Sequence, residues 1–308
     1  MMTPDNSYHP RTFAVAVPIQ RMLRLAVTSR AETFDRLQAP LADRGIEVAH
    51  LPAEERTVAL DTTPTESFDV GFVFPSRTQS GAALSALHGL PWVNGRDAVL
   101  TSRNKGGVLA TLDAAGLPVP RTTMVASPVD DDAIADAADR LGWPVVVKPN
   151  STTRGTGVAK ATDLDSLLGI VDYLDLVHDY RATGDKTFLL QEYLPDARDY
   201  RVMVVDDAYA GAVERRLPEA DRESGRWKHN VHRGAEAVGV DLPADHRRLA
   251  ERAAAALGVS YLGVDLLVTD DRVVVAETNA RPTVDSATKY VPDFYDRLAG
   301  LIRRTANG

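Results

Sequence analysis

The sequence contains no cysteine, which excludes disulfide bonds, thiolate metal ligands and a cysteine nucleophile. It also lacks a Walker A pattern and a complete GxGxxG after a strand, which disfavours a P-loop or a classical Rossmann nucleotide site. The net charge of −8 leaves no broad basic surface for nucleic acid. No apolar run approaches membrane-spanning length, and the first residues lack the order of a signal peptide. We therefore expect a cytoplasmic protein that binds neither nucleic acid nor membrane.

What remains is the composition of an ordinary soluble protein. The 308 residues are 44% hydrophobic and 25% charged, and this length suffices for two or three domains with proper cores. Residues 1–21 are predicted to form a flexible extension before the first strand. Strands over 22–30, 47–52, 69–75 and 91–95 then alternate with helices over 31–45 and 80–89. This alternation predicts an open, mostly parallel α/β sheet in a domain spanning 22–97.

Two further units of α+β type are predicted. The first, 98–185, begins with one helical stretch over 97–120 and continues with strands over 121–127, 144–150 and 158–161 and helices over 131–142 and 163–179. The second, 186–308, is rich in strands, over 187–195, 199–207 and 209–217. It adds a helix over 244–258, a hairpin over 261–279 and a closing helix over 292–305.

The hairpin carries two acids on apolar strands. Glu277 and Asn279 are two residues apart, so they share one face of their strand. If the loop is 270–272, Thr269 pairs with Val273 and Asp265 lies opposite Glu277. Two clustered carboxylates need a counter-charge, and Mg²⁺ accepts one or two carboxylates beside phosphate oxygens. Simple pairing with Arg or Lys explains the two acids equally well.

A second candidate site follows the strand that ends at Lys148. The loop "STTRGTG" (151–157) contains small and hydroxyl residues, and its free backbone N–H groups can cradle an anion beside the lysine charge. The strand "LLQEYLP" ends at Gln191 and Glu192, where backbone groups can meet an adenine edge and the carboxylate a ribose. Each feature alone is also consistent with a solvated loop or an ordinary strand end.

Cations gather in the strand-rich half of this acidic chain. They lie within three segments. These are "DYRVMVV", which contains Arg201 beside Asp199, "AVERRLP", which contains Arg215 and Arg216, and "RWKHNVHRG". Cations near a metal-type acid cluster suit a polyphosphate, which needs both to neutralise it. Any single arginine can be explained as one half of a salt bridge, but the whole set favours a site.

Taken in order, these pieces resemble a known family. Lys105, the Lys148 loop, "QEYL", "DYRVMVV", "ERR", "NVHRGA", "GVDLLV" and "ETNARP" together are similar to the ATP-grasp superfamily, and within it to the RimK-like carboxylate–amine (α-L-glutamate) ligases. The resemblance runs from about residue 22 to the end. It implies an ATP-grasp fold, α/β and α+β, with an N-terminal pre-ATP-grasp, Rossmann-like domain.

The resemblance also assigns roles to residues. Lys105 and Lys148 would hold ATP phosphates, and the loop with Thr153, Gly155 and Gly157 would close over the triphosphate. Further nucleotide-contacting positions would be Gln191, Glu192, Tyr193, Leu194, Asp199, Lys228, His229 and Asn230. Asp265, Glu277 and Asn279 would ligate Mg²⁺ or Mn²⁺, with two ions. Arg201, Arg215 and Arg216 are the candidates for stabilising an acyl phosphate, and the sequence leaves open which of the last two faces the site.

Two departures from the family pattern stand out. Close RimK relatives usually have small residues, Pro and Gly after the metal-type asparagine, whereas this chain has "ARPT". Arg281 thereby becomes a candidate for contact with a phosphate or an anionic substrate. Lys228 and His229 replace a common Arg–Ser pair.

The resemblance implies an ATP-dependent ligase that activates a carboxylate as an acyl phosphate and joins it to an amine. Glutamate or a similar amino acid is the expected amine, and a peptide, protein tail or cofactor is the expected acceptor. A homo-oligomer would be normal for the resemblance. A kinase on the same fold, and an ATP-binding regulatory module without turnover, are the alternatives. The clustered Asp265, Glu277 and Asn279 argue against the regulatory module.

Overall fold

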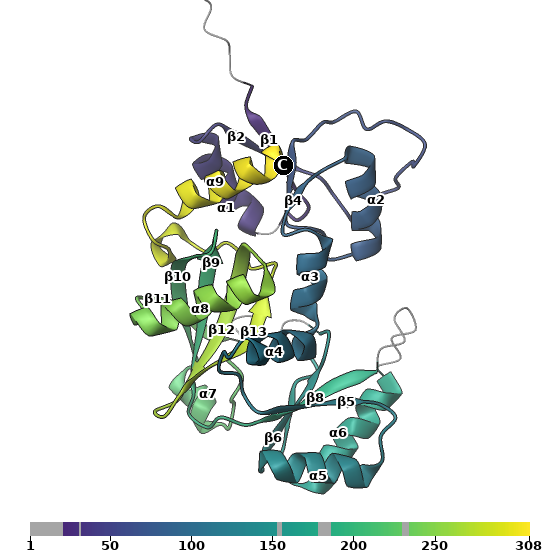
Figure 1. The fold of residues 1–308 in the computed structure, drawn as a ribbon, viewed down its shortest axis with the longest axis vertical. Helices are drawn as coiled ribbons and strands as arrows, with labels where there is room; N and C mark the ends of the chain where they lie inside the picture. Colours follow the sequence, from purple (N-terminus) through teal and green to yellow (C-terminus); the bar gives the residue numbers. More distant parts are fainter. Residues whose placement is uncertain (1–20, 31, 153–155, 178–185, 230–233) are drawn as a thin grey trace, which may run out of the picture.

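The computed structural model describes residues 21–30, 32–152, 156–177, 186–229 and 234–308. Three sheets follow one another along the long axis of the molecule (Figure 1). A four-stranded sheet, β2-β1-β3-β4, lies at the top, a five-stranded sheet, β11-β10-β9-β12-β13, in the middle, and a four-stranded sheet, β5-β8-β6-β7, at the bottom. The predicted mixture of an α/β unit and α+β units is confirmed.

The upper unit is built as the alternating pattern predicts. Its strands are all parallel: β1 (Leu23–Val27), β2 (Ile46–His50), β3 (Val70–Phe72) and β4 (Trp92–Val93). Helices α1 (Glu32–Ala42) and α2 (Thr78–His88) belong to the same unit. The last helix, α9 (Phe294–Asn307), packs Phe294, Leu298 and Ile302 into the core of this unit. The sequence analysis assigned that helix to the third unit, because a chain order alone does not reveal a return crossing.

The predicted single helical stretch over 97–120 is two helices. They are α3 (Arg96–Arg103) and α4 (Lys105–Ala114), and Asn104 between them has non-helical backbone angles, φ −82° and ψ 86°. The Asn104 side chain accepts a hydrogen bond from the backbone N–H of Gly107 at 2.9 Å, so it caps α4. The change of direction brings Lys105, the first residue of α4, to the middle sheet.

The lower unit contains a strand that the sequence analysis placed elsewhere. Its strands are β5 (Thr122–Ala126), β6 (Val145–Pro149), β7 (Ala159–Ala161) and β8 (Thr187–Glu192), with helices α5 (Asp131–Leu141) and α6 (Leu164–Val177). Because β8 lies between β5 and β6 and pairs with both, the predicted boundary at 185/186 is wrong. The division between the lower unit and the middle sheet instead follows Glu192. The sequence did not predict this, because pairing with strands far back in the chain leaves no local signal.

The middle sheet is antiparallel. Its strands are β9 (Arg198–Val205), β10 (Ala208–Arg216), β11 (Glu236–Val240), β12 (Tyr261–Val268) and β13 (Val273–Asn279). Helix α8 (Ala244–Leu257) and α4 share a buried core with this sheet. The short helix α7 (Glu219–Glu223), the 3₁₀ turn Ala287–Lys289 and β11 were not predicted. Small and polar residues dominate these segments and blur their periodicity.

The hairpin of β12 and β13 combines one correct and one wrong prediction. Val268, not Thr269, pairs with Val273, so the loop starts one residue earlier than expected. A bulge beyond the Leu266–Val275 pair then shifts the register by one residue. Asp265 therefore does lie directly opposite Glu277, as predicted.

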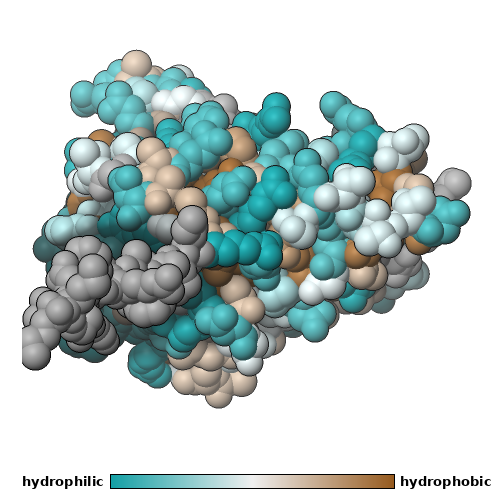
Figure 2. All heavy atoms as spheres, turned by 90° about the horizontal axis from the view of Figure 1, so that it is seen from above, coloured by the Kyte–Doolittle hydropathy of each residue, from teal (hydrophilic) through white to brown (hydrophobic). Residues whose placement is uncertain are grey.

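Hydrophilic side chains cover most of the face seen from above, and hydrophobic ones are scattered between them (Figure 2). Among the residues that the structure describes, no helix combines the length and the apolar character needed to cross a membrane.

Candidate active site

A cavity of about 1000 Å³ lies between the lower and the middle sheet. Strands β6, β7 and β8 line one side of it, and β9, β10, β12 and β13 line the other. It collects most of the site residues expected from the sequence: Lys148, Gln191, Glu192, Tyr193, Leu194, Asp199, Arg201, Arg215, Arg216, Lys228, His229, Asp265 and Glu277.

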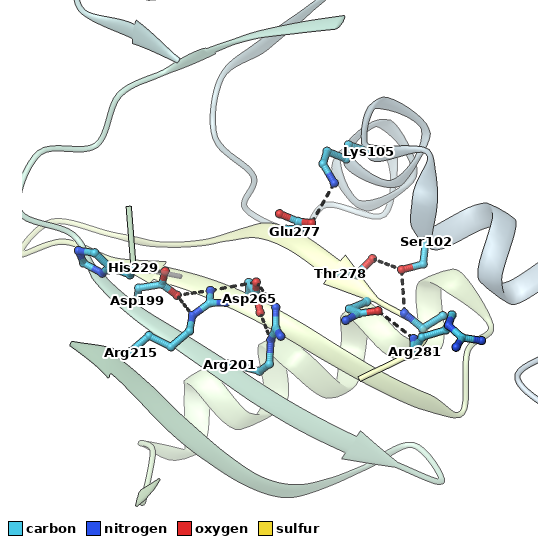
Figure 3. A network of polar contacts seen from close by, with 12 residues as sticks. Ser102, Lys105, Asp199, Arg201, Arg215, His229, Asp265, Glu277, Thr278 and Arg281 are labelled. Carbon is cyan, nitrogen blue, oxygen red and sulfur yellow. Dashed lines mark hydrogen bonds and ion pairs between the residues drawn. The ribbon is translucent and has the colours of Figure 1, made fainter. Parts of the chain in front are cut away.

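Asp265 is the centre of an ion-pair network on the middle sheet (Figure 3). Its carboxylate is only 5% exposed and accepts hydrogen bonds from Arg201 Nε at 2.7 Å, Arg201 Nη2 at 2.8 Å and Arg215 Nη2 at 2.9 Å. Burial alone would raise the pKa of Asp265, but the two guanidinium groups outweigh it and lower the pKa to about 2. The carboxylate is therefore charged at neutral pH.

The network continues from Arg215 to Asp199. Arg215 Nε donates to Asp199 Oδ1 at 2.9 Å, and a second hydrogen bond joins the same groups. On the other side of Asp199, His229 Nδ1 lies 3.9 Å from Oδ2 and has no hydrogen-bond partner among the described residues. Burial raises the pKa of Asp199 despite Arg215, and burial lowers the pKa of His229. One arginine thus serves two buried acids.

Glu277 is bound from a different direction. Lys105 Nζ, at the start of α4, lies 2.9 Å from Glu277 Oε1 (Figure 3). Asn279 follows on β13, and its Oδ1 accepts a hydrogen bond from the backbone N–H of Arg281 at 2.9 Å. Cationic side chains thus pair with both carboxylates, as the salt-bridge explanation predicts. The explanation by a metal ion is also compatible with the structure.

The donor set at the hairpin fits a hard cation. Asp265 and Glu277 are paired residues on neighbouring strands, and Asn279 adds an amide oxygen. No cluster of three or more His, Cys, Asp or Glu side chains able to hold a metal occurs in the described part of the chain. Any ion here would rely on two carboxylates, an amide and outside oxygens, which is the coordination that Mg²⁺ adopts beside phosphates.

Lys148 and the start of α4, which carries Lys105, are each held by hydrogen bonds. Lys148 Nζ donates to Gln191 Oε1 at 2.6 Å, and burial lowers the pKa of this lysine. Two residues on, the buried Asn150 accepts from the backbone N–H of Gly106 at 2.8 Å and donates to Asn104 Oδ1 at 3.0 Å. Asn150 was not predicted, although its place in "VVVKPN", two residues after Lys148, could have indicated it.

In the aromatic part of the cavity, Tyr193 was predicted as a site residue, but Trp227 and Lys160 were not. Trp227 meets Tyr193 edge to face at 5.8 Å between ring centroids, and Lys160 Nζ lies 4.6 Å from the Tyr193 centroid and 5.6 Å from that of Trp227. Lys228 lies 5.5 Å from the same indole and donates to the backbone carbonyl of Val158. These side chains line part of the cavity and place two aromatic rings beside positive charge.

Two predicted site residues that line the cavity, Glu192 and Arg216, are bound by other side chains of the protein. Glu192 lines the cavity, but its carboxylate is bound by Arg121 at 3.0 Å and by Arg272 at 2.8 Å, so it is engaged within the protein. Arg216 is half-exposed and donates to Glu214 at 2.8 Å instead of contacting Asp265. Of the two adjacent arginines, Arg215 joins the acid network.

Three predicted site residues, Thr153, Gly155 and Asn230, lie outside the described residues. Gly157 is described and has a φ of +73°, which favours glycine, but it is not among the residues that line the cavity.

Comparison with known proteins matches this arrangement. The family model for the RimK-like ATP-grasp domain matches residues 102–294, well over half of the chain. A protein of Stenotrophomonas maltophilia (strain K279a) named "Probable alpha-L-glutamate ligase" is 33% identical over 202 residues, which are 65% of this chain and 64% of that protein. The chain thus matches less than two thirds of the length of this curated relative.

Solved structures agree on the fold. The ATP-grasp ligase PsnB complexed with minimal precursor aligns with a TM-score of 0.67 at 20% identity, over 93% of this chain and 100% of that one. D-alanine–D-alanine ligase from Bacillus anthracis complexed with ATP aligns with a TM-score of 0.65 at 18% identity, over 92% and 97%. These similarities confirm the predicted ATP-grasp fold, and with the family match they show that the chain belongs to the RimK-like ATP-grasp family.

Proposed function

We propose that the chain is an ATP-dependent carboxylate–amine ligase that forms an amide bond through an acyl phosphate. The observation that carries this proposal is the cavity between two sheets, in which Asp265 and Glu277 lie among Lys148, Arg201 and Arg215. Acids and cations so arranged can hold a polyphosphate with its metal, and the proposed reaction needs no nucleophile from the protein.

The nucleotide occupies the cavity in this proposal. Lys105 and Lys148 bind its phosphates, and the loop 151–157 covers them. The Tyr193–Trp227 surface receives the base, and the strand end at Gln191 to Leu194 offers backbone groups to it. Asp265, Glu277 and Asn279 would hold Mg²⁺ or Mn²⁺, which would neutralise phosphate charge during transfer.

The reaction has two steps. A carboxylate oxygen of the acceptor attacks the γ-phosphorus, the bond from that phosphorus to the β–γ bridging oxygen breaks, and ADP leaves. The amine nitrogen then attacks the acyl carbon, the bond to the phosphate oxygen breaks, and phosphate leaves while the amine loses a proton. Arg201 and Arg215 are placed to stabilise the negative charge that builds up on the transferred phosphate and the acyl oxygens.

The amine is proposed to be glutamate or a similar amino acid. The name of the Stenotrophomonas relative supports an amino-acid amine, and the complex of PsnB with a precursor supports a peptide as one class of acceptor. A protein tail or a cofactor carboxylate has the same reactive group and remains in the proposal.

Release of ADP and phosphate with ATP and Mg²⁺, across amino acids and acidic acceptors, tests this function. We expect phosphate release that depends on one amine–acceptor pair, with a product whose mass is that of the two parts less one water. A product heavier than its acceptor by one phosphoryl group, formed without free phosphate, would instead identify a kinase. ATP binding without turnover for any pair would favour a regulatory module.

A further inference from the structure

Two arginines meet where the upper unit touches the middle sheet. Ser102 Oγ accepts a hydrogen bond from the backbone N–H of Ala280 at 2.9 Å (Figure 3), and Arg103 and Arg281 are the next residues of the two segments. Arg103 Nη2 donates to the carbonyl of Ser76 at 2.6 Å, and Arg281 Nη1 donates to that of Phe74. Both side chains therefore reach the segment that follows β3.

Neither guanidinium has an acid partner among the described residues, although the chain is acidic overall. The acid whose charge acts on Arg281 is Glu54, which is paired with Arg77 at 3.2 Å. The side chains of Arg103 and Arg281 are both partly buried. Two partly buried like charges without a counter-charge are unfavourable, and an anion between them would relieve this.

The position of the pair relates it to the proposed reaction. The backbone N–H of Arg281 donates to Asn279 Oδ1, so the pair adjoins the strand that carries Glu277. Phe74 and Ser76 follow the carboxyl end of β3, and ligands of open α/β sheets bind outside the carboxyl ends of the strands. The arginine pair thus lies beside the end of the strand that carries the proposed metal ligands Glu277 and Asn279.

We propose that Arg103 and Arg281 bind a second oxyanion of the acceptor, remote from the carboxylate that is activated. The acceptor is then at least a dianion, with a carboxylate or a phosphate at its far end. This inference rests on the proposed ligase function. It is favoured over a purely structural role because two carbonyl contacts use few of the donors that two guanidinium groups carry, and guanidinium geometry suits bidentate binding of carboxylate or phosphate.

Binding is tested with three acids of similar length, glutarate, 4-phosphonobutyrate and pentanoate, in the presence of ADP and Mg²⁺ at constant ionic strength. We expect calorimetry to show tighter binding of the two dianionic acids than of pentanoate, and their relative affinities distinguish a carboxylate from a phosphate at the far end. Arg103→Met and Arg281→Met should each weaken dianion binding by roughly tenfold to a hundredfold, the range for hydrogen bonds to charged groups.

Controls separate this effect from misfolding. Arg248→Met makes the same change at an exposed position on α8 and should leave the preference for dianions intact. Arg281→Lys keeps the charge and should retain part of the preference, and unliganded melting temperatures show whether each variant is folded. A preference that survives both Arg103→Met and Arg281→Met, or its absence from the wild type, would overturn the inference.

A turnover measurement distinguishes failure of the inference from failure of the proposed function. Hydroxylamine serves as an amine without a carboxylate and converts an acyl phosphate to a hydroxamate with release of phosphate. Equal hydroxamate yields from pentanoate and glutarate would leave the ligase standing and refute the second anion site. No hydroxamate from any acid, with dianion binding that still depends on Arg281, would refute the ligase and keep the site.

Discussion

Asp265 and Glu277 lie directly opposite each other on β12 and β13, yet different cationic side chains of the described residues bind them. Arg201 from β9 and Arg215 from β10 bind Asp265, whereas Lys105 from α4 binds Glu277. The hairpin brings the acids together, and separate elements bring the cations. Charges fixed in this way need little rearrangement when a phosphate enters, which is how electrostatic preorganisation lowers a barrier.

The first prediction concerns Glu277. Glu277→Ala removes half of the carboxylate charge of the proposed metal site and frees the ammonium of Lys105. We expect turnover to fall by at least about 100-fold, the order found when one preorganised electrostatic contact is lost. Initial rates of phosphate release as a function of Mg²⁺ concentration measure the change.

Asp270→Ala is the matched control, because Asp270 is an exposed acid in the loop of the same hairpin. It should behave like the wild type. Nearly normal Mg²⁺-dependent turnover in Glu277→Ala would contradict the assignment of Glu277 as a metal ligand.

Adjacent arginines on β10 provide the second prediction. Arg215→Met leaves Asp199 and Asp265 buried with one cation fewer and should cost about 3–5 kcal/mol of unfolding free energy, as for a broken buried ion pair. Arg216→Met removes a half-exposed partner of Glu214, which keeps Arg198, and should cost less than about 1 kcal/mol.

Urea unfolding of the two variants measures the difference, and phosphate release should fall only in Arg215→Met. Equal losses in both would mean that Arg215 is no more important to the network than its exposed neighbour. This pair of variants also answers the question that the sequence left open.

The sequence predicted the two acids and their pairing better than it predicted the strands around them. Asp265 opposite Glu277 followed from the hairpin, but the loop was placed one residue late, and a bulge that no residue type announces restored the pairing. Which of Arg215 and Arg216 faces the site could not be predicted from the sequence. The direction of a side chain depends on the register of its strand, and pairing with β9 fixes that register.

Long-range pairing explains the other errors. β8 joins strands that precede it by many residues, and α9 returns to the upper unit, so neither placement has a local signal. Motifs bring together residues from distant parts of the chain, which hydrophobic periodicity does not. Lys148, Asp199 and Arg201 were predicted as site residues from motifs alone, and all three line the cavity.

The third prediction concerns Asn150, which ties the start of α4 to the end of β6. Asn150→Ala breaks its contacts with Gly106, Asn104 and Thr187, and should raise KM for ATP by about tenfold because Lys105 and Lys148 lose their common support. Asn150→Asp keeps the acceptor for Gly106 and should have a smaller effect.

Thr111→Ala, on an exposed position of α4, is the control and should leave KM for ATP unchanged. If Asn150→Ala lowered only the melting temperature and not the affinity for ATP, the network would support the fold without positioning the lysines.

The last prediction uses the pH dependence of stability. The pKa of Asp265 is about 2 in the folded protein and 3.8 for the free side chain, so the unfolded chain binds this proton more readily. The stabilisation by Asp265 is therefore complete above about pH 4 and is lost as the pH falls toward 2, and the shift corresponds to about 2 kcal/mol.

Asp265→Asn lacks this titration. Urea unfolding at about pH 5, 4 and 3 should show that the advantage of the wild type over Asp265→Asn shrinks with acidity. In this range the unfolded wild-type chain takes up the proton, whereas Arg201 and Arg215 keep Asp265 charged in the folded protein. An advantage that stayed constant down to pH 3 would mean that folding leaves the pKa of Asp265 unchanged, and that its arginines do not hold it charged.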